Sequence, residues 1–105
     1  MPQSSAELKA QMLAALAHPN RIRIIEHLQR ETRCNCELGP ALDLEQSNLS
    51  RHLKVLVQAG ILSSSKEGLR VNFRVADARV FKILDLADAL AKQSVEMRAE
   101  ALEEA

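Results

Sequence analysis

Residues 34–60 read CNCELGPALDLEQSNLSRHLKVLVQAG, and this stretch decides the fold of the chain. Its second half carries an apolar stripe at helical spacing, formed by Leu49, Leu53 and Leu56. This spacing predicts an amphipathic helix that begins near Ser47 and stops at Gly60. A shorter helical segment, at about 36–42, precedes it, and residues 43–46 form the turn between the two. The stretch therefore predicts a helix-turn-helix.

The other faces of the longer helix carry hydrogen-bond donors suited to base edges and phosphates. These residues are Ser47, Asn48, Ser50, Arg51, His52, Lys54 and Gln58, and Gln46 at the end of the turn joins the predicted DNA-contacting set. Between positions 46 and 59 there is no Asp or Glu, whereas an exposed helix face usually mixes both signs of charge. The pattern indicates a polyanionic partner, although an ordinary solvated face fits this helix equally well when it is taken alone.

The residues that follow predict a β-hairpin at 61–76. In its second strand the apolar positions alternate with polar ones at Leu69, Val71, Phe73 and Val75. Glu67 and Gly68 mark the turn, and residues 61–65 form the partner strand. Lys66 and Arg70 place two cations near the tip, where they can meet phosphate. The fold class predicted is a mainly α winged helix-turn-helix with a small β-hairpin.

In order and spacing, four runs of the chain resemble the ArsR/SmtB family of bacterial metal- and metalloid-responsive repressors. They are ALAHPNRIRIIEHL, CNCEL, QSNLSRHLKVLVQAGIL and SSSKEGLRVNFRV, and the resemblance covers roughly residues 10 to 95. It implies a homodimeric repressor of transcription that binds double-stranded operator DNA. It also implies that the affinity for this DNA falls when an inducer binds.

Composition agrees with a small dimeric domain. The 105 residues form one predicted domain, 1–105, with 47% hydrophobic residues but only two Phe and no Trp or Tyr. So small a core is marginal alone, and dimerisation would add burial. The formal net charge is zero, so any DNA affinity depends on segregated charge. Such segregation exists, because residues 47–74 contain one acid, Glu67, against Arg51, Lys54, Lys66, Arg70 and Arg74.

The sequence predicts a cytoplasmic protein with no membrane partner. No apolar run approaches the roughly 20 residues that a membrane span needs, and no secretory signal is evident at the N-terminus. Cys34 and Cys36 are too close together in sequence to act as a long-range disulfide staple. In a reducing compartment we expect them to be thiols.

Three further helices complete the prediction. An N-terminal helix within 1–17 is capped by Ser4, and Pro19 begins a second helix, after a turn or cap at His18. In this second helix Arg21 and Arg23 are expected to point outward. A long helix at 78–103 follows Asp77 as its cap. By the family resemblance, the first and last helices pair with their counterparts across a two-fold axis.

The two cysteines are the candidate metal ligands. A thiolate pair suits soft ions such as As(III), Sb(III), Cd(II), Pb(II) or Cu(I), and Arg33 with the helix N-terminus favours the thiolate form. Side chains two residues apart share a side in an extended segment but not in a helix, so one ion holds both sulfurs only if 34–36 is not helical. The polar neighbours Arg33, Asn35 and Glu37 argue against burial of the pair, and a purely structural role for buried cysteines is the alternative.

Departures from the family bear on the inducer. Arsenical repressors of the best-known type carry a third cysteine where this chain has Gly39. Asp77 matches the first ligand of the zinc and nickel sensors, but Arg79 and Leu90 stand where His is needed. Two sulfurs leave one position of As(III) or Sb(III) for an outside ligand. Inorganic arsenite is the preferred inducer, followed by a substituted trivalent arsenical and then by Cd(II) or Pb(II); no permanently bound cofactor is predicted.

Two other functional classes compete with a repressor. The CxC pair could belong to a small thiol redox protein or to a soft-metal-handling protein, but the strand pattern that usually frames such a motif is missing from the sequence. A dimerisation module without DNA binding would not explain the basic hairpin. The sequence therefore favours a regulator that is not an enzyme.

Overall fold

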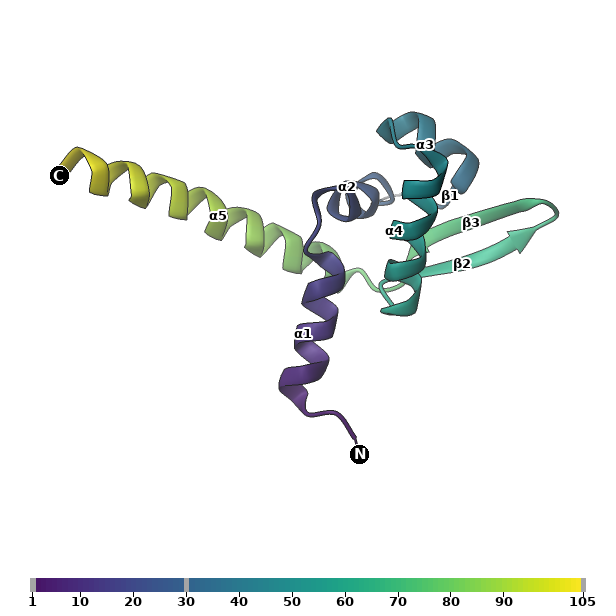
Figure 1. The fold of residues 1–105 in the computed structure, drawn as a ribbon, viewed down its shortest axis with the longest axis horizontal. Coiled ribbons are helices and arrows are strands. Elements are labelled where there is room, and N and C mark those ends of the chain that lie inside the picture. Colours follow the sequence, from purple (N-terminus) through teal and green to yellow (C-terminus); the bar gives the residue numbers. More distant parts are fainter. Residues whose placement is uncertain (1, 30, 105) are drawn as a thin grey trace.

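The computed structural model describes residues 2–29 and 31–104. Along the chain the elements are α1 (Ser5–Leu16), α2 (Pro19–His27), β1 (Arg33–Cys34), α3 (Asn35–Leu42), α4 (Gln46–Gln58), β2 (Leu62–Glu67), β3 (Arg70–Val75) and α5 (Arg79–Glu104). Helices α1 to α4 cluster in a body from which the β2–β3 hairpin extends on one side and α5 on the other (Figure 1). The predicted winged helix-turn-helix is confirmed, with α4 as its second helix.

Side chains cap the helices as the sequence predicts. The Ser4 hydroxyl accepts a hydrogen bond from the backbone N–H of Glu7 at 3.1 Å, and Nδ1 of His18 accepts one from Asn20 N–H at 3.1 Å. At the last helix, Asp77 Oδ1 accepts one from the N–H of Arg79 at 2.9 Å. Each bond satisfies a donor that the helix itself leaves unpaired, so these three caps fix where α1, α2 and α5 begin.

The core lies where the first four helices meet the base of the hairpin. Its largest fully buried side chains are Ile24, Ile25, Leu38, Leu49, Leu56 and Ile61. Of these, Leu38 belongs to α3 and Leu49 and Leu56 to α4, the two helices of the helix-turn-helix. Because these side chains are removed from water together, α3 and α4 are held as one packed unit.

Two arginines of α2 are predicted to point outward, and of these Arg23 is exposed as predicted whereas Arg21 is half-buried. Nε of Arg21 donates to the carbonyl of Ala15 at 2.7 Å, and Nη2 of Arg23 donates to the carbonyl of Leu42 at 2.8 Å. Both carbonyls belong to the last turn of a neighbouring helix, where backbone acceptors lack helical partners. Helix α2 therefore ties down the C-terminal ends of both α1 and α3.

Helix α3 runs from Asn35 to Leu42, close to the predicted 36–42, with Pro40 inside it. Proline removes one hydrogen bond from this short helix. Cys34 and Glu37 offset that loss with a reciprocal capping box at its start. Helix α4 carries the predicted DNA-contacting residues and is called the reading helix below. It begins one residue before the predicted Ser47.

A short strand, β1, which the sequence does not predict, contains Arg33 and the first cysteine. It pairs antiparallel with β3, placing Arg33 opposite Phe73 and Cys34 opposite Asn72, and the three strands lie in the order β1-β3-β2. The antiparallel β2–β3 pairing extends to Glu67 opposite Arg70. The first cysteine thereby lies opposite Asn72, on the strand that follows the hairpin tip.

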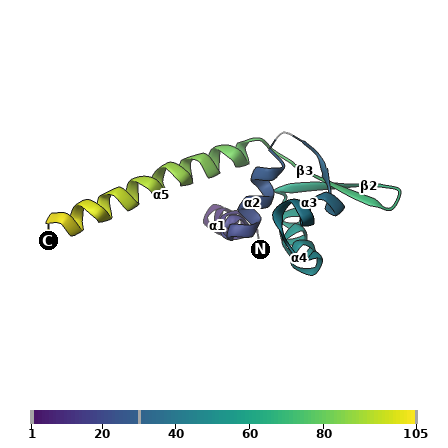
Figure 2. The same cartoon turned by 90° about the horizontal axis from the view of Figure 1, so that it is seen from above.

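Leu69 does not lie where the alternating pattern predicts. The alternating pattern assigns it to the buried face of a strand, but it lies in the turn before β3 and is fully exposed. The turn passes through Gly68, whose φ of +65° suits a residue without a side chain. No other element within residues 2–29 and 31–104 covers the tip (Figures 1 and 2). Alternation therefore predicts which face of the strand is buried, but not where along the strand that burial ends.

Helix α5 projects from the body over most of its length (Figures 1 and 2). Val80 is buried, and Phe81 and Leu84 pack partly against the core. Beyond this first stretch, large apolar side chains are exposed at Leu86, Leu90, Val95, Met97 and Leu102. Among the described residues, no helix combines the length and apolar character that crossing a membrane requires.

Candidate metal centre and nucleic-acid interface

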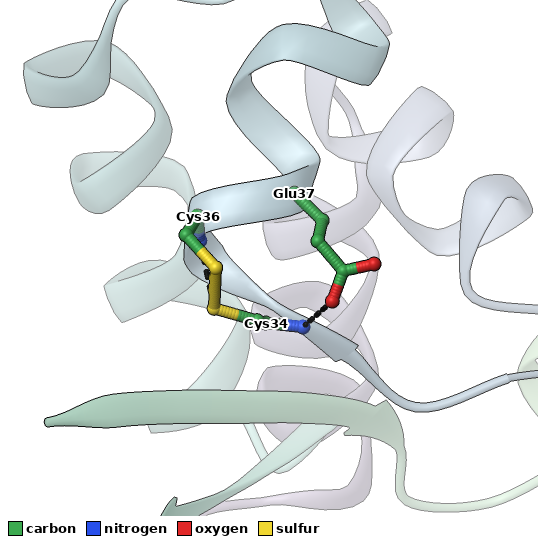
Figure 3. Close-up of side chains that lie close together, drawn as sticks. All are labelled: Cys34, Cys36 and Glu37. Carbon is green, nitrogen blue, oxygen red and sulfur yellow. Dashed lines mark hydrogen bonds between the residues drawn. A yellow bond between two sulfur atoms is a disulfide. The ribbon is translucent and has the colours of Figure 1, made fainter. Parts of the chain in front are cut away.

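The two cysteines lie at the junction of β1 and α3. Cys34 has an extended backbone and serves as the N-cap of α3, while Cys36 lies in the first turn of that helix. Their Cα atoms are 5.2 Å apart and their sulfurs are joined by a disulfide bond (Figure 3). The segment meets the condition that the sequence sets for a shared ligand, since it is not helical throughout. The structure holds the oxidised pair, whereas the sequence predicts thiols.

Burial separates the two sulfurs. Cys34 is only 1% exposed, whereas Cys36 is exposed at the surface. The prediction that polar neighbours keep both cysteines exposed is therefore wrong for Cys34. Pairing of β1 with β3 turns this side chain beneath the first turn of α3, where its sulfur accepts a hydrogen bond from Cys36 N–H at 3.1 Å. Local polarity does not reveal burial that arises from strand pairing.

Glu37 supplies a carboxylate beside the sulfurs. Its Oε1 accepts a hydrogen bond from the backbone N–H of Cys34 at 3.4 Å (Figure 3), and Oε2 lies 3.3 Å from Nη1 of Arg33. These two contacts, in that order, lower the pKa of Glu37, so this carboxyl stays ionised. One potential ligand atom each from Cys34, Cys36 and Glu37 lie within 4.8 Å of one another. Two sulfurs and one oxygen thus converge in one place.

Arg70 connects the hairpin to this cluster. Its Nη2 lies 3.7 Å from Sγ of Cys36 and 3.3 Å from Oε1 of Glu37. The side chain comes from the first residue of β3 and remains 59% exposed. A residue predicted to meet phosphate therefore also touches the candidate metal ligands.

The position of the missing third cysteine points elsewhere. A Cβ placed on Gly39 would lie 3.3 Å from the carbonyl oxygen of Leu44 and 3.6 Å from Cδ2 of Leu49. A side chain at this position begins against α4 rather than beside the sulfurs. Within residues 2–29 and 31–104, the cluster of Cys34, Cys36 and Glu37 is the one group of three or more Cys, His, Asp or Glu side chains suited to a metal.

The predicted DNA-contacting residues of α4 lie mostly on an exposed face. Those exposed are Gln46, Ser47, Asn48, Ser50, Arg51 and Lys54. Asn48 Oδ1 accepts a hydrogen bond from Nη2 of Arg51 at 3.0 Å, which orients the guanidinium along the helix. Lys66 and Arg70 are exposed on the hairpin. Donors on α4 and cations on the hairpin are thus available to one extended partner.

His52 lies apart from that face. Its ring stands 4.4 Å from the ring of His18, the N-cap of α2, and its Nδ1 is buried without a hydrogen-bond partner. Burial is the largest cause that lowers the pKa of His52, and electrostatic interactions with His18, Arg21 and Arg51 lower it further. The structure therefore places this histidine in the packing between α4 and α2.

Comparison with known proteins gives the lineage. Residues 18–64 match the bacterial regulatory protein family arsR. Over 83 residues the chain is 37% identical to the HTH-type transcriptional repressor SmtB of Mycobacterium tuberculosis, which covers 79% of this chain and 62% of that one. It is 30% identical over 91 residues to a Streptomyces lividans protein named "Probable mercury resistance operon repressor", with 87% and 73% covered.

The chain belongs to the ArsR/SmtB family. Among solved structures, that of M. tuberculosis Rv0081 superposes with a TM-score of 0.80 at 32% identity and covers 93% of this chain and 99% of that one. The family consists of winged helix-turn-helix transcriptional regulators rather than enzymes. The chain spans 62% of the length of the mycobacterial SmtB repressor.

Proposed function

We propose that this ArsR/SmtB protein is a dimeric transcriptional repressor that leaves its operator when a thiophilic metalloid binds Cys34 and Cys36. The observation that carries the proposal is the convergence of two sulfurs and a carboxylate within 4.8 Å at the start of α3. This helix packs directly on the reading helix α4. A structural change at the ligand site therefore needs to pass only through α3 to reach the DNA-facing surface of α4.

On the DNA side, the exposed donors of α4 are assigned to the major groove. They are Gln46, Ser47, Asn48, Ser50 and Arg51. Lys54, Lys66 and Arg70 are assigned to phosphates, which position the protein without reading sequence. His52 is assigned a packing role, because its ring rests on His18.

A second copy of the chain is proposed to cover α1 and α5. Leu8 and Leu13 on α1 are each 53% exposed, and the apolar positions of α5 from Leu86 onward are at least as exposed. Surface of this kind is unfavourable in water, and an isologous pairing would bury it on both protomers at once. The dimer would also set the spacing of two reading helices on the DNA.

For the inducer, the structure offers a third ligand that the sequence argument sought outside the chain. Glu37 brings an oxygen to the two sulfurs, which completes a three-coordinate set for As(III) or Sb(III). Inorganic arsenite remains the first choice, followed by a substituted trivalent arsenical that needs only the sulfurs. A carboxylate also suits Cd(II) or Pb(II), which rank next. The mercury-related name of the Streptomyces relative is in keeping with a soft, thiophilic inducer.

The contacts of Glu37 couple metalloid binding to DNA binding. Its carboxylate contacts the backbone N–H of Cys34 as part of the cap, and it pairs with Arg33 and with Arg70 of the hairpin. Recruitment of Glu37 by a metalloid would open the cap and release both arginines. Helix α3 and the hairpin would then lose the ion pair between Glu37 and Arg70, which disfavours the DNA-competent arrangement.

A mobility-shift titration tests this function. Reduced protein bound to the DNA upstream of its own coding region is titrated with arsenite, antimonite, methylarsenite and Cd(II). The variant with Cys34→Ser and Cys36→Ser should bind the same DNA and ignore all four. Serine is a good N-cap, so it can replace the sulfur of Cys34 in that role. Release of this double variant by Zn(II) or Ni(II) would overturn the thiol assignment.

Glu37→Gln separates the third ligand from the sulfurs. The amide oxygen can still accept the hydrogen bond from Cys34 N–H, but it is a poorer metal ligand and carries no charge. Operator binding should persist, while release should need more arsenite. An unchanged arsenite titration would remove Glu37 from the ligand set and leave the sulfur pair in place.

A further inference from the structure

We propose that oxidation of Cys34 and Cys36 to their disulfide is a second regulatory signal. It abolishes the response to metalloid while leaving operator binding intact. The inference rests on the proposed function and adds a regulation to the same site. Both chemistries use the same two sulfurs, since the bridged atoms are also the soft ligands of the cluster. A sulfur engaged in a disulfide is not a thiolate ligand, so the two states exclude each other.

The local geometry gives the two cysteines different roles in oxidation. Cys36 is exposed and meets a dissolved oxidant first, whereas Cys34 is 1% exposed and lies within bonding reach of Cys36. With a hydroperoxide as oxidant, the Cys36 thiolate attacks one oxygen. The O–O bond breaks, the other oxygen leaves as hydroxide or alkoxide and takes up the proton that the Cys36 thiol had released to solvent, and Cys36 becomes a sulfenic acid.

Cys34 then completes the bridge. Its sulfur attacks the sulfenic sulfur, the S–S bond forms, the S–O bond breaks, and the hydroxide leaves as water with the proton from Cys34. Overall, two thiols and one hydrogen peroxide give one disulfide and two waters, and the two electrons pass from sulfur to oxygen. A thiol reductant reverses the step by exchange.

With the disulfide in place, the cysteines contact the elements that lead to the DNA-facing surface. Cys36 N–H reaches the sulfur of Cys34, Glu37 closes the cap, and β1 pairs with β3. Leu38 is fully buried in the core that α4 shares. An ion between the sulfurs would hold them further apart than a direct bond and would draw Glu37 away. The disulfide does neither, so the helix-turn-helix stays assembled.

The test compares reduced and peroxide-treated full-length protein on the same labelled operator, each with and without arsenite. Loss of both iodoacetamide-reactive thiols after denaturation verifies the bridge. Oxidised protein should bind the operator within about twofold of reduced protein, whereas reduced protein should lose about fivefold or more of its affinity with arsenite. Arsenite should leave the oxidised complex bound, and dithiothreitol should restore release.

Single variants test the order of attack. In Cys34→Ser, the remaining Cys36 should form a sulfenic acid that dimedone traps, while Cys36→Ser should label much more slowly because its remaining thiol is buried. Equal labelling would overturn the assignment of roles. Release of the oxidised complex by arsenite, or loss of operator binding on oxidation alone, would overturn the proposed redox control of the metalloid response. If reduced protein fails to respond to arsenite and the other thiophilic probes, the proposed function is wrong, and so is the redox control that rests on it.

Discussion

Nη2 of Arg70 lies 3.7 Å from Sγ of Cys36, although the two residues are 34 positions apart in sequence. The same guanidinium pairs with Glu37 at 3.3 Å. A wing residue that is available to phosphate is thus held by the group that would bind the inducer. This contact is a direct physical route between the two sites, because loading of the sulfurs changes what Arg70 can touch.

Replacing Arg70 with Ala should affect both binding and response. Operator affinity should fall and its salt dependence should flatten, since one phosphate contact is lost. The ratio of operator affinities without and with arsenite should also shrink severalfold from a wild-type value of about 5 to 150. Fluorescence anisotropy with labelled operator measures both quantities.

Lys66→Ala is the matched control for Arg70. It removes an exposed cation from β2 of the same hairpin. It should weaken binding to all DNA sequences alike and leave the arsenite ratio unchanged. Equal arsenite ratios in the two variants would separate Arg70 from the response.

Arg51→Ala should reduce sequence specificity. Arg51 is exposed on α4 and oriented by Asn48 at 3.0 Å, as suits a side chain that reads a base edge. The loss should be about 1 to 3 kcal/mol at the specific site and much smaller on unrelated DNA. Competition assays with specific and random duplexes give the two values. Equal losses on both duplexes would assign Arg51 to phosphate instead.

Acid should destabilise the fold through His52. Burial lowers its pKa in the folded protein below the ordinary value of 6.5, so the unfolded chain binds the proton more readily. The stabilisation that depends on neutral His52 is fully present above pH 6.5 and is lost as the pH falls toward the lowered pKa. Urea unfolding between pH 7.5 and 5 should show this loss.

His52→Gln should flatten that pH dependence. His27→Gln, which removes a histidine from the last turn of α2 instead, is the control and should retain the wild-type slope. If both variants lose stability between pH 7.5 and 5 as steeply as wild type, the His18–His52 packing is not the acid-sensitive element.

Charges on α5 should split the proposed dimer. Leu86 and Leu90 are each 66% exposed in the single chain, and neither contributes to its buried core. Replacing both with Glu should give a folded monomer, seen by sedimentation and far-UV circular dichroism. Its operator affinity should be much weaker, because two linked reading helices become one. A dimer that survives both charges would place the interface elsewhere.

Local patterns predicted most of the fold, because they are set by local physics. Leu49, Leu53 and Leu56 repeat at helical spacing, and Ser4 and Asp77 show where their helices begin. Strand β1 escaped because two residues are too few to show alternation. The outward prediction failed for Arg21 because its acceptor lies in another helix, which no periodicity within α2 can reveal.

The sequence predicted only part of the candidate site. The CxC motif indicates the two sulfur ligands, but the position of Glu37 was missed. The C-x-x-E spacing from Cys34 to Glu37 resembles a capping box, and this signal could have predicted that the carboxylate lies beside the first cysteine. The Arg70 contact had no such signal, because it depends on the hairpin folding back beside α3. Burial of Cys34 arises in the same way, through pairing with β3.

The most direct measurement is the affinity of reduced protein for arsenite, free and bound to its operator. Linkage requires that arsenite bind the DNA complex more weakly by the same factor by which arsenite weakens DNA binding, about 5 to 150. Calorimetry gives the arsenite affinities and anisotropy gives those for DNA. We expect the two factors to agree in wild type and arsenite binding to vanish in the double Cys→Ser variant. Equal arsenite affinity for free and operator-bound protein would contradict metalloid-driven release through Cys34 and Cys36.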